Sequence, residues 1–177
     1  MPRTSKKDLA LAAALDILGE TLSISDITYD SLSKATGITK SGLIYHFPDR
    51  HSMLVELHHY CAGRWEKELE SLAGDSADNL TPEQRYRAST RSMAKNDPLV
   101  ELLMSIHAET HPDYFAAWHG VTTRWLPDPS DDNIDPDLLL RSLIAQGLWV
   151  HDHLNERKLS PANRERITSK LLGEEEN

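Results

Sequence analysis

The sequence contains a single cysteine, Cys61, among its 177 residues, so no intramolecular disulfide is possible. Chains without disulfides are typical of a reducing compartment, and we expect a cytoplasmic protein. No apolar run approaches the ~18 residues of a membrane-spanning helix, and the N-terminus lacks the apolar core of a signal peptide. These absences predict a protein without a membrane partner.

The short motifs of common enzymes are also absent. The sequence has no glycine-flanked nucleophile elbow, no glycine-rich phosphate loop and no HExxH motif. We therefore predict that the protein is not an enzyme and that it uses no cofactor.

An overall positive charge is the third absence. The formal net charge is −9, and residues 1–50 contain six basic and six acidic residues, so residues 51–177 carry the whole excess of acid. Any basic groups that contact phosphate must therefore be local. We predict two domains on this basis, one over residues 1–50 and one over residues 51–177.

Two short helices with a tight turn between them are predicted from Thr28 to Phe47. Thr28 and Thr39 are typical N-cap residues, and Gly37 favours the left-handed conformation that ends a helix. Pro48 prevents the second helix from continuing. Such a pair forms a helix-turn-helix, and its second helix has the size of a DNA major groove.

The second helix has an apolar and a polar side. We expect Leu43, Ile44 and Phe47 to anchor it to a core, while groups that bind bases and phosphates occupy the other side. Those groups belong to Thr39, Lys40, Ser41, Tyr45 and His46. Gly42 costs roughly 1 kcal/mol relative to alanine, which a close approach of the backbone to phosphate would explain. The alternative is a structural helix pair with a solvated polar face.

The segment KSGLIYHFPDRHSMLVEL, residues 40–57, resembles the recognition helix and following helix of the TetR family of bacterial transcriptional regulators. The matching residues are Leu43, Tyr45, His46, Phe47, Pro48 and Arg50, whereas Ile44 stands where the family often has tyrosine. The resemblance implies an all-α fold, with a three-helix N-terminal helix-turn-helix DNA-binding domain joined to a larger helical ligand-binding and dimerisation domain. It implies a ligand-responsive repressor with DNA contacts from Tyr29, Thr39, Lys40, Ser41, Gly42, Leu43, Tyr45, His46 and Arg50.

Helical patterns continue through the rest of the chain, and no segment is predicted as a strand. We expect a first helix over residues 5–19, a helix of about 20 residues after Pro48, and helices that start at Pro82, Pro136 and Pro161. A capping box of Thr81 and Gln84 strengthens one of these starts.

The helix that begins at Pro136 is apolar on more than one side, so we expect it to be well buried. The resemblance implies that the last two long helices form a homodimer, which would present two heads to the paired half-sites of double-stranded operator DNA. The alternative is a central core helix of a single chain.

Three groups of potential metal ligands occur in the sequence. They are His58 with Cys61; His107, Glu109 and His111; and His151, Asp152 and His153. None has the ligand spacing of a structural zinc site, and solvated histidines near helix ends are more common. We predict no metal site, and the competing hypothesis is a helical enzyme or metal-binding protein with an incidental helix-turn-helix.

The resemblance also implies a small-molecule effector inside the helical body. All four tryptophans lie outside residues 1–50, and the predicted ligand-binding residues are Trp65, His107, Trp118, Trp125 and Trp149. Aromatic faces in an acidic body favour a flat, lipophilic cation. Such compounds are cargo of multidrug efflux pumps, so we expect control of an efflux-pump gene. The alternative is that the tryptophans only fill the core and the acidic residues only keep the protein soluble.

Overall fold

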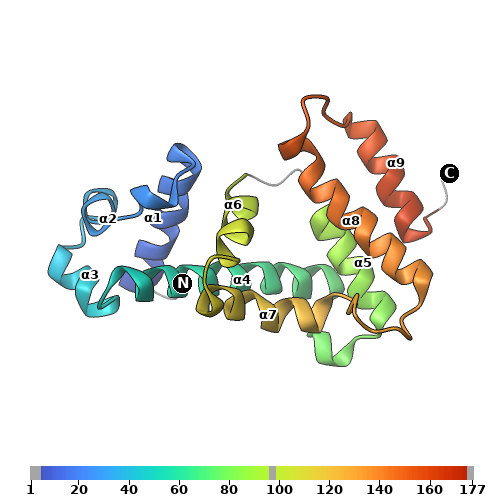
Figure 1. The fold of residues 1–177 in the computed structure, drawn as a ribbon, viewed down its shortest axis with the longest axis horizontal. Helices are drawn as coiled ribbons and strands as arrows, with labels where there is room; N and C mark the ends of the chain where they lie inside the picture. The colour runs from blue at the N-terminus through green and yellow to red at the C-terminus, as the bar shows by residue number, and fades with distance from the viewer. Residues whose placement is uncertain (1–4, 96–98, 175–177) are drawn as a thin grey trace. The chain divides into compact units, whose positions relative to one another are not determined.

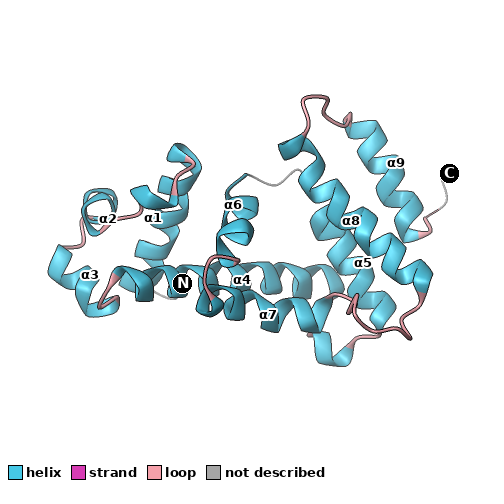
Figure 2. Ribbon diagram, in the orientation of Figure 1, coloured by secondary structure: helices cyan, strands magenta, loops and turns pink. Residues whose placement is uncertain are grey.

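The computed structural model describes residues 5–95 and 99–174. These residues form nine α-helices and two short 3-10 helices, and no strand occurs among them (Figure 2). The predicted all-α fold is confirmed. None of the helices in the described parts of the chain is long and apolar enough to cross a membrane.

The chain folds as two compact units. Unit 1 comprises Met1–Gly63 and Pro98–Trp118, and unit 2 comprises Arg64–Asp97 and His119–Asn177. Two helices, α4 (Arg50–Ala73) and α7 (Pro112–Trp125), contribute residues to both units. The expected boundary at residue 50 falls at the first residue of α4, while unit 1 continues to Gly63 and takes in later helices.

Unit 1 is built around α1 (Lys6–Thr21), which contacts α2 (Tyr29–Thr36), α3 (Lys40–His46) and α6 (Leu99–Ala108) (Figure 1). A 3-10 helix, η1 (Ile24–Asp26), follows α1. The unit has one hydrophobic core, to which α1, α2, α3, α4 and α6 all contribute. Its fully buried members include Leu18, Ile27, Leu32, Leu43, Phe47 and Leu57.

The ends of α2, α3 and α4 are set by local hydrogen bonds. The Thr28 hydroxyl accepts the Ser31 amide in a capping box, and Thr39 accepts the Gly42 amide at 3.2 Å. Gly37 has φ +72°, a left-handed conformation that favours glycine. Asp49 accepts the amide of Ser52 at 2.7 Å. The caps predicted at Thr28, Gly37 and Thr39 are therefore confirmed.

Unit 2 contains η2 (Ala77–Asn79), α5 (Pro82–Met93), α8 (Pro136–Leu154) and α9 (Pro161–Leu172). The helix α8 contacts both α5 and α9 (Figure 1). Met93, Ala145, Leu148 and Leu171 form a buried cluster, and Trp65 and Trp149 pack against it. The predicted capping box of Thr81 and Gln84 opens α5.

A buried ion pair joins α8 to α9. Arg164 donates to Asp152 at 2.9 Å, and the same guanidinium donates to the carbonyls of Ala94 and Leu148. Asp152 also accepts the amide of Leu159, and this bond, followed by the contact with Arg164, lowers the pKa of the Asp152 carboxyl. Asp152 therefore has a structural role between α8 and α9.

The expectation that α8 is well buried is wrong for one of its sides. Ser142, Ala145, Leu148 and Asp152 are buried, whereas Leu140, Leu143 and Ile144 are 56%, 52% and 41% exposed. A helix that packs on α5 and α9 along one stripe leaves its other apolar positions uncovered within one chain.

Candidate DNA-binding and effector sites

The core of unit 1 determines which side of α3 faces outward. Leu43 and Phe47 are fully buried, whereas Ile44 is 48% exposed. Residues four apart lie nearly above one another on a helix, while the next residue is turned by about 100°. The expectation that Ile44 anchors α3 is therefore wrong. Leu43, expected among the DNA contacts, holds α3 in place and its side chain does not reach the surface.

The polar groups of α3 lie on the exposed side. Tyr45 is 83% exposed, and its ring packs edge-on against His46 with 5.3 Å between ring centroids. Ser41 and Lys40 are also exposed, and Lys40 forms an ion pair of 2.5 Å with Asp30 of α2. An exposed ion pair of this kind contributes about 0–1 kcal/mol to stability, so the Lys40 ammonium group can exchange Asp30 for a phosphate at little cost.

Several expected DNA contacts also have structural roles. The Tyr29 hydroxyl donates to the Phe47 carbonyl at 2.6 Å, which ties α2 to the end of α3. A side chain at Gly42 would place its Cβ 3.1 Å from Ile38 Cγ2 and 3.2 Å from Thr39 Oγ1, closer than ordinary contacts. Arg50 donates one N–H to the Ile24 carbonyl at 2.9 Å, which leaves other guanidinium donors.

A buried polar network lies elsewhere in unit 1. The indole N–H of Trp118 donates to His58 Nδ1 at 2.9 Å, and His58 Nε2 lies 3.0 Å from His107 Nδ1. Because His58 Nδ1 accepts, its hydrogen is assigned to Nε2, which then donates to His107. Both ring nitrogens of His58 are thus engaged, so His58 is not a ligand of the hypothetical site with Cys61.

Burial keeps these histidines neutral. Removal from water, followed by the charges of His107 and His59, lowers the pKa of His58 to about 4. Burial and the nearby Arg50 lower the pKa of His107 as well. The ring of Tyr114 stacks on both imidazoles, with centroid separations of 4.8 and 5.0 Å.

The residues predicted for the effector belong to different units. Trp118 and His107 lie together in unit 1, whereas Trp65, Trp125 and Trp149 lie in unit 2. Trp65 donates to Ser92 at 3.2 Å, Trp149 packs on the buried cluster, and Trp125 is 1% exposed and donates to Glu66. Trp125 is therefore a core residue.

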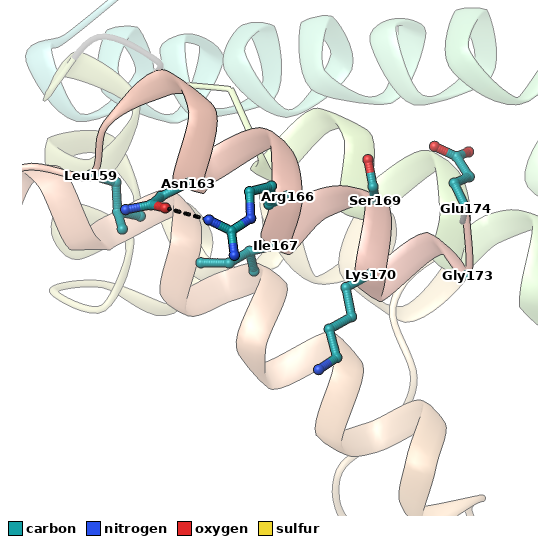
Figure 3. Close-up of a pocket in the computed structure, with 8 residues that line it drawn as sticks. All are labelled: Leu159, Asn163, Arg166, Ile167, Ser169, Lys170, Gly173 and Glu174. Atoms are coloured by element: carbon teal, nitrogen blue, oxygen red, sulfur yellow. Dashed lines mark hydrogen bonds between the residues drawn. The ribbon is translucent and has the colours of Figure 1, made fainter. Parts of the chain in front are cut away.

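A pocket of about 900 Å³ lies along α9 in unit 2 (Figure 3). None of the predicted effector residues lines it. In Figure 3 the guanidinium of Arg166 lies near Ile167 and donates to Asn163, and Lys170 extends away from the helix. The complete lining is Leu159, Asn163, Arg166, Ile167, Ser169, Lys170, Gly173 and Glu174.

No sequence motif indicated a functional role for His51. This residue lies in the first turn of α4, next to His111 and Asp113 at the start of α7. The expected group of His107, Glu109 and His111 is thereby divided, since His107 contacts His58 and His111 contacts His51. Because His51 and His111 are 60 residues apart, no local sequence pattern indicated that they are neighbours.

A helix-turn-helix with an exposed polar recognition helix, in an all-α chain, has the architecture of a DNA-binding regulator. Residues 83–174 match the family model described as the tetracyclin repressor-like C-terminal domain, which covers more than half of the chain. The chain belongs to the TetR family of transcriptional regulators. Members of this family are regulators rather than enzymes, and they bind DNA and small-molecule effectors and dimerise.

Solved structures share the fold across nearly the whole chain. A transcriptional regulator from Rhodococcus sp. Rha1 is 13% identical with a TM-score of 0.67, and the alignment covers 96% of this chain and 95% of that one. A protein described as a transcriptional regulator from Streptomyces coelicolor A3(2) is 16% identical, with a TM-score of 0.64 and coverages of 94% and 97%. A protein described as a TetR-family regulator from Rhodococcus sp. is 18% identical, with a TM-score of 0.64 and 97% coverage of both chains. No curated protein matches the chain.

We predict that His58 makes the folded protein less stable as the pH falls. Unfolded His58 binds a proton near its ordinary pKa of 6.5, whereas folded His58 binds one only near pH 4. The contribution of neutral His58 to the free energy of unfolding is fully present above pH 6.5. About 3 kcal/mol of this contribution is lost as the pH falls to 4. Urea unfolding at intervals between pH 7 and pH 4 measures this slope.

The variant His58→Gln is the control, because glutamine does not titrate. Its stability should change less steeply over the same interval, whatever its absolute value. The carboxyls of Asp49 and Asp152 have lowered pKa values, so their contributions are lost below about pH 4 and leave this interval undisturbed. An equal slope in His58→Gln contradicts the prediction.

Proposed function

We propose that the chain is a ligand-responsive repressor that binds double-stranded operator DNA through the exposed side of α3. Residues 1–50 supply the DNA contacts, and residues 51–177 supply effector binding and dimerisation. The observation that carries the proposal is the 83% exposure of Tyr45 on a helix whose opposite side is fully buried. A large aromatic side chain that remains in water, beside hydroxyl, ammonium and imidazole groups, has the chemistry of base and phosphate recognition.

The proposed DNA contacts of α3 and its flanking residues divide into two roles. Tyr45 and His46 lie in its last turn and are assigned to base edges. Lys40 and Arg50 are assigned to phosphates, because their charged groups flank α3 at either end. Further backbone and hydroxyl groups near the same surface belong to Tyr29, Thr39, Ser41 and Gly42. Gly42 adds no side chain of its own to the first turn of α3.

For the base contacts, we predict that Tyr45→Ala and His46→Ala reduce the preference for operator over unrelated DNA. Each lost contact is expected to cost ~1–3 kcal/mol, roughly a 5- to 150-fold change in affinity. Gel-shift titration on the DNA upstream of the chain's own gene measures the ratio. The matched control is His59→Ala, an exposed histidine outside α3, which should leave the ratio unchanged.

For the phosphate contacts, Lys40→Ala should instead weaken all DNA binding and reduce its salt dependence. A change in preference at one base pair would contradict that role.

The homodimer is proposed to form through α8 and α9. Leu140, Leu143 and Ile144 are exposed on one side of α8, and Gly147 continues this side one turn further along with open space around it. Contiguous apolar surface of this kind is typical of a protein interface. An isologous contact would also place two copies of α3 in one particle, as paired half-sites require.

We therefore expect Leu143→Glu to shift the protein from dimer to monomer, because an interface would bury an unpaired carboxylate. Sedimentation velocity at micromolar concentration measures the change. Ile106→Glu introduces the same charge at a site on α6 that is 59% exposed, and this variant should sediment as the parent does. A dimeric Leu143→Glu variant would exclude this surface.

The effector is proposed to be a lipophilic cation, and the regulated gene an efflux-pump gene. Trp65 and Trp149 are partly exposed and pack against the same buried cluster, so we assign the cation to their rings. Glu66 and Asp152 are paired with Arg124 and Arg164, so attraction would come from the rings and the surface acid. Burial and the nearby Arg50 lower the pKa of His107, so its surroundings disfavour a positive charge and the cation is not assigned to His107 and Trp118 of unit 1.

We predict that ethidium or a quaternary ammonium compound quenches tryptophan fluorescence and releases operator DNA. Trp149→Leu keeps an apolar side chain but removes the ring face, so it should weaken binding at least several-fold. Trp118→Leu, in unit 1, should change dye affinity less. Unchanged fluorescence and intact operator binding at high micromolar dye would reject the cation and leave a repressor with a neutral effector.

A further inference from the structure

A convergent group of two imidazoles and a carboxylate lies in unit 1, apart from the recognition helix. His51 Nε2 lies 2.9 Å from Asp113 Oδ2, and His111 Nδ1 lies 3.6 Å from the same oxygen. One potential ligand atom from each of the three residues lies within 4.8 Å of the others. The three side chains are each about 43–58% exposed, so an ion can reach them from water.

These distances are close to those of a zinc site. Zinc lies 2.0–2.2 Å from nitrogen and oxygen ligands in a tetrahedral arrangement, so two ligand atoms are roughly 3.3–3.5 Å apart. The two separations from Asp113 Oδ2 lie on either side of that value. Small rotations of exposed side chains therefore suffice to close the set around an ion.

The surroundings of His51 match those of a metal ligand. Its other ring nitrogen, Nδ1, lies 3.0 Å from the hydroxyl of Tyr114. The Asp113 carboxylate can only accept, so in the neutral ring His51 Nε2–H donates to it and Nδ1 accepts from Tyr114. An ion that replaces this Nε2 hydrogen bond shifts the ring hydrogen to Nδ1, which then donates to the Tyr114 hydroxyl as the second N–H of a metal-bound histidine usually does. Tyr114 is 7% exposed, so its hydroxyl is held in place by the core.

His111 Nδ1 also lies at the site. It accepts the Asp113 amide at 3.2 Å, so in the neutral ring this nitrogen carries no hydrogen, and an ion would take its lone pair in place of this exposed hydrogen bond. The rings of His51 and His111 have centroids only 4.5 Å apart. A divalent cation uses both neutral rings and the carboxylate at once.

We propose that His51, His111 and Asp113 bind a divalent transition-metal ion of the zinc class. Two imidazoles and a carboxylate suit zinc, nickel or copper rather than calcium or magnesium, which prefer oxygen ligands. Three protein ligands leave one position for water, so the ion is exchangeable rather than required for folding.

The ion would connect two elements of unit 1. His51 lies in the first turn of α4, directly after the recognition helix and next to Arg50, whereas His111 and Asp113 lie at the start of α7. Binding restrains the residues that follow α3, so it is expected to alter operator affinity. The site itself is independent of the proposed function, but this coupling rests on it.

Calorimetric titration of the full chain with Zn²⁺ at pH 7 tests the site. One ion should bind per chain, and His51→Ala and Asp113→Asn should each weaken binding at least tenfold. Tyr114→Phe keeps the ring but removes the hydroxyl, and it should weaken binding about tenfold through the orientation of His51. His59→Ala removes an exposed histidine from the same helix and should change nothing.

The outcomes separate the two claims. Equal Zn²⁺ affinity in the parent and in Asp113→Asn, or an equal loss in His59→Ala, overturns the site. Circular dichroism confirms that each variant is folded. In operator gel shifts, Zn²⁺ should change the affinity of the parent at least threefold relative to chelated protein, and leave Asp113→Asn unaffected. If the parent binds Zn²⁺ and binds operator equally with and without it, the coupling is overturned and the site stands; if it binds no operator in either state, the proposed function fails.

Discussion

The burial of Leu43 and Phe47 is the constraint on which the proposed DNA-binding surface depends. Both side chains lie in the core that α1, α2, α4 and α6 also fill, and together they fix the rotation of α3 about its axis. Tyr45 is then held in water and Lys40 beside Asp30. The Tyr29 hydroxyl secures the end of the same helix through the Phe47 carbonyl. A seven-residue helix has too few internal hydrogen bonds to be stable alone, so these tertiary contacts give it a defined surface.

Several polar side chains of unit 1 contact Tyr114. Its ring stacks on His58 and His107, which burial keeps neutral, and its hydroxyl contacts His51. One residue of α7 therefore touches both a buried histidine pair and an exposed one. The buried pair is satisfied by hydrogen bonds and serves the core, whereas the exposed pair has a carboxylate and access to water. This difference in environment, rather than residue type, separates a structural group from a candidate metal site.

Unit 2 combines a buried ion pair with an uncovered apolar side on the same helix. Asp152 of α8 is held by Arg164 and by the Leu159 amide, which fixes α9 against α8. The side of α8 with Leu140, Leu143 and Ile144 receives no cover from α5 or α9. A helix that is fixed by an ion pair on one side and exposes apolar side chains on the other is expected where a second copy of the chain covers the exposed side. Membership of the TetR family agrees with this interpretation.

The sequence by itself determined the helical fold, the helix-turn-helix and most helix ends. Caps such as Thr28, Gly37, Thr39 and Thr81 act through hydrogen bonds within three or four residues, so local sequence is sufficient for them. Only the tertiary structure decided which apolar residues are buried, as with Ile44 and Leu143, because burial depends on which neighbouring helices cover each side. The same holds for His51 with Asp113 and for His58 with His107, whose partners lie 62 and 49 residues away. Contacts across such separations form only when helices pack, and no periodicity within one helix encodes them.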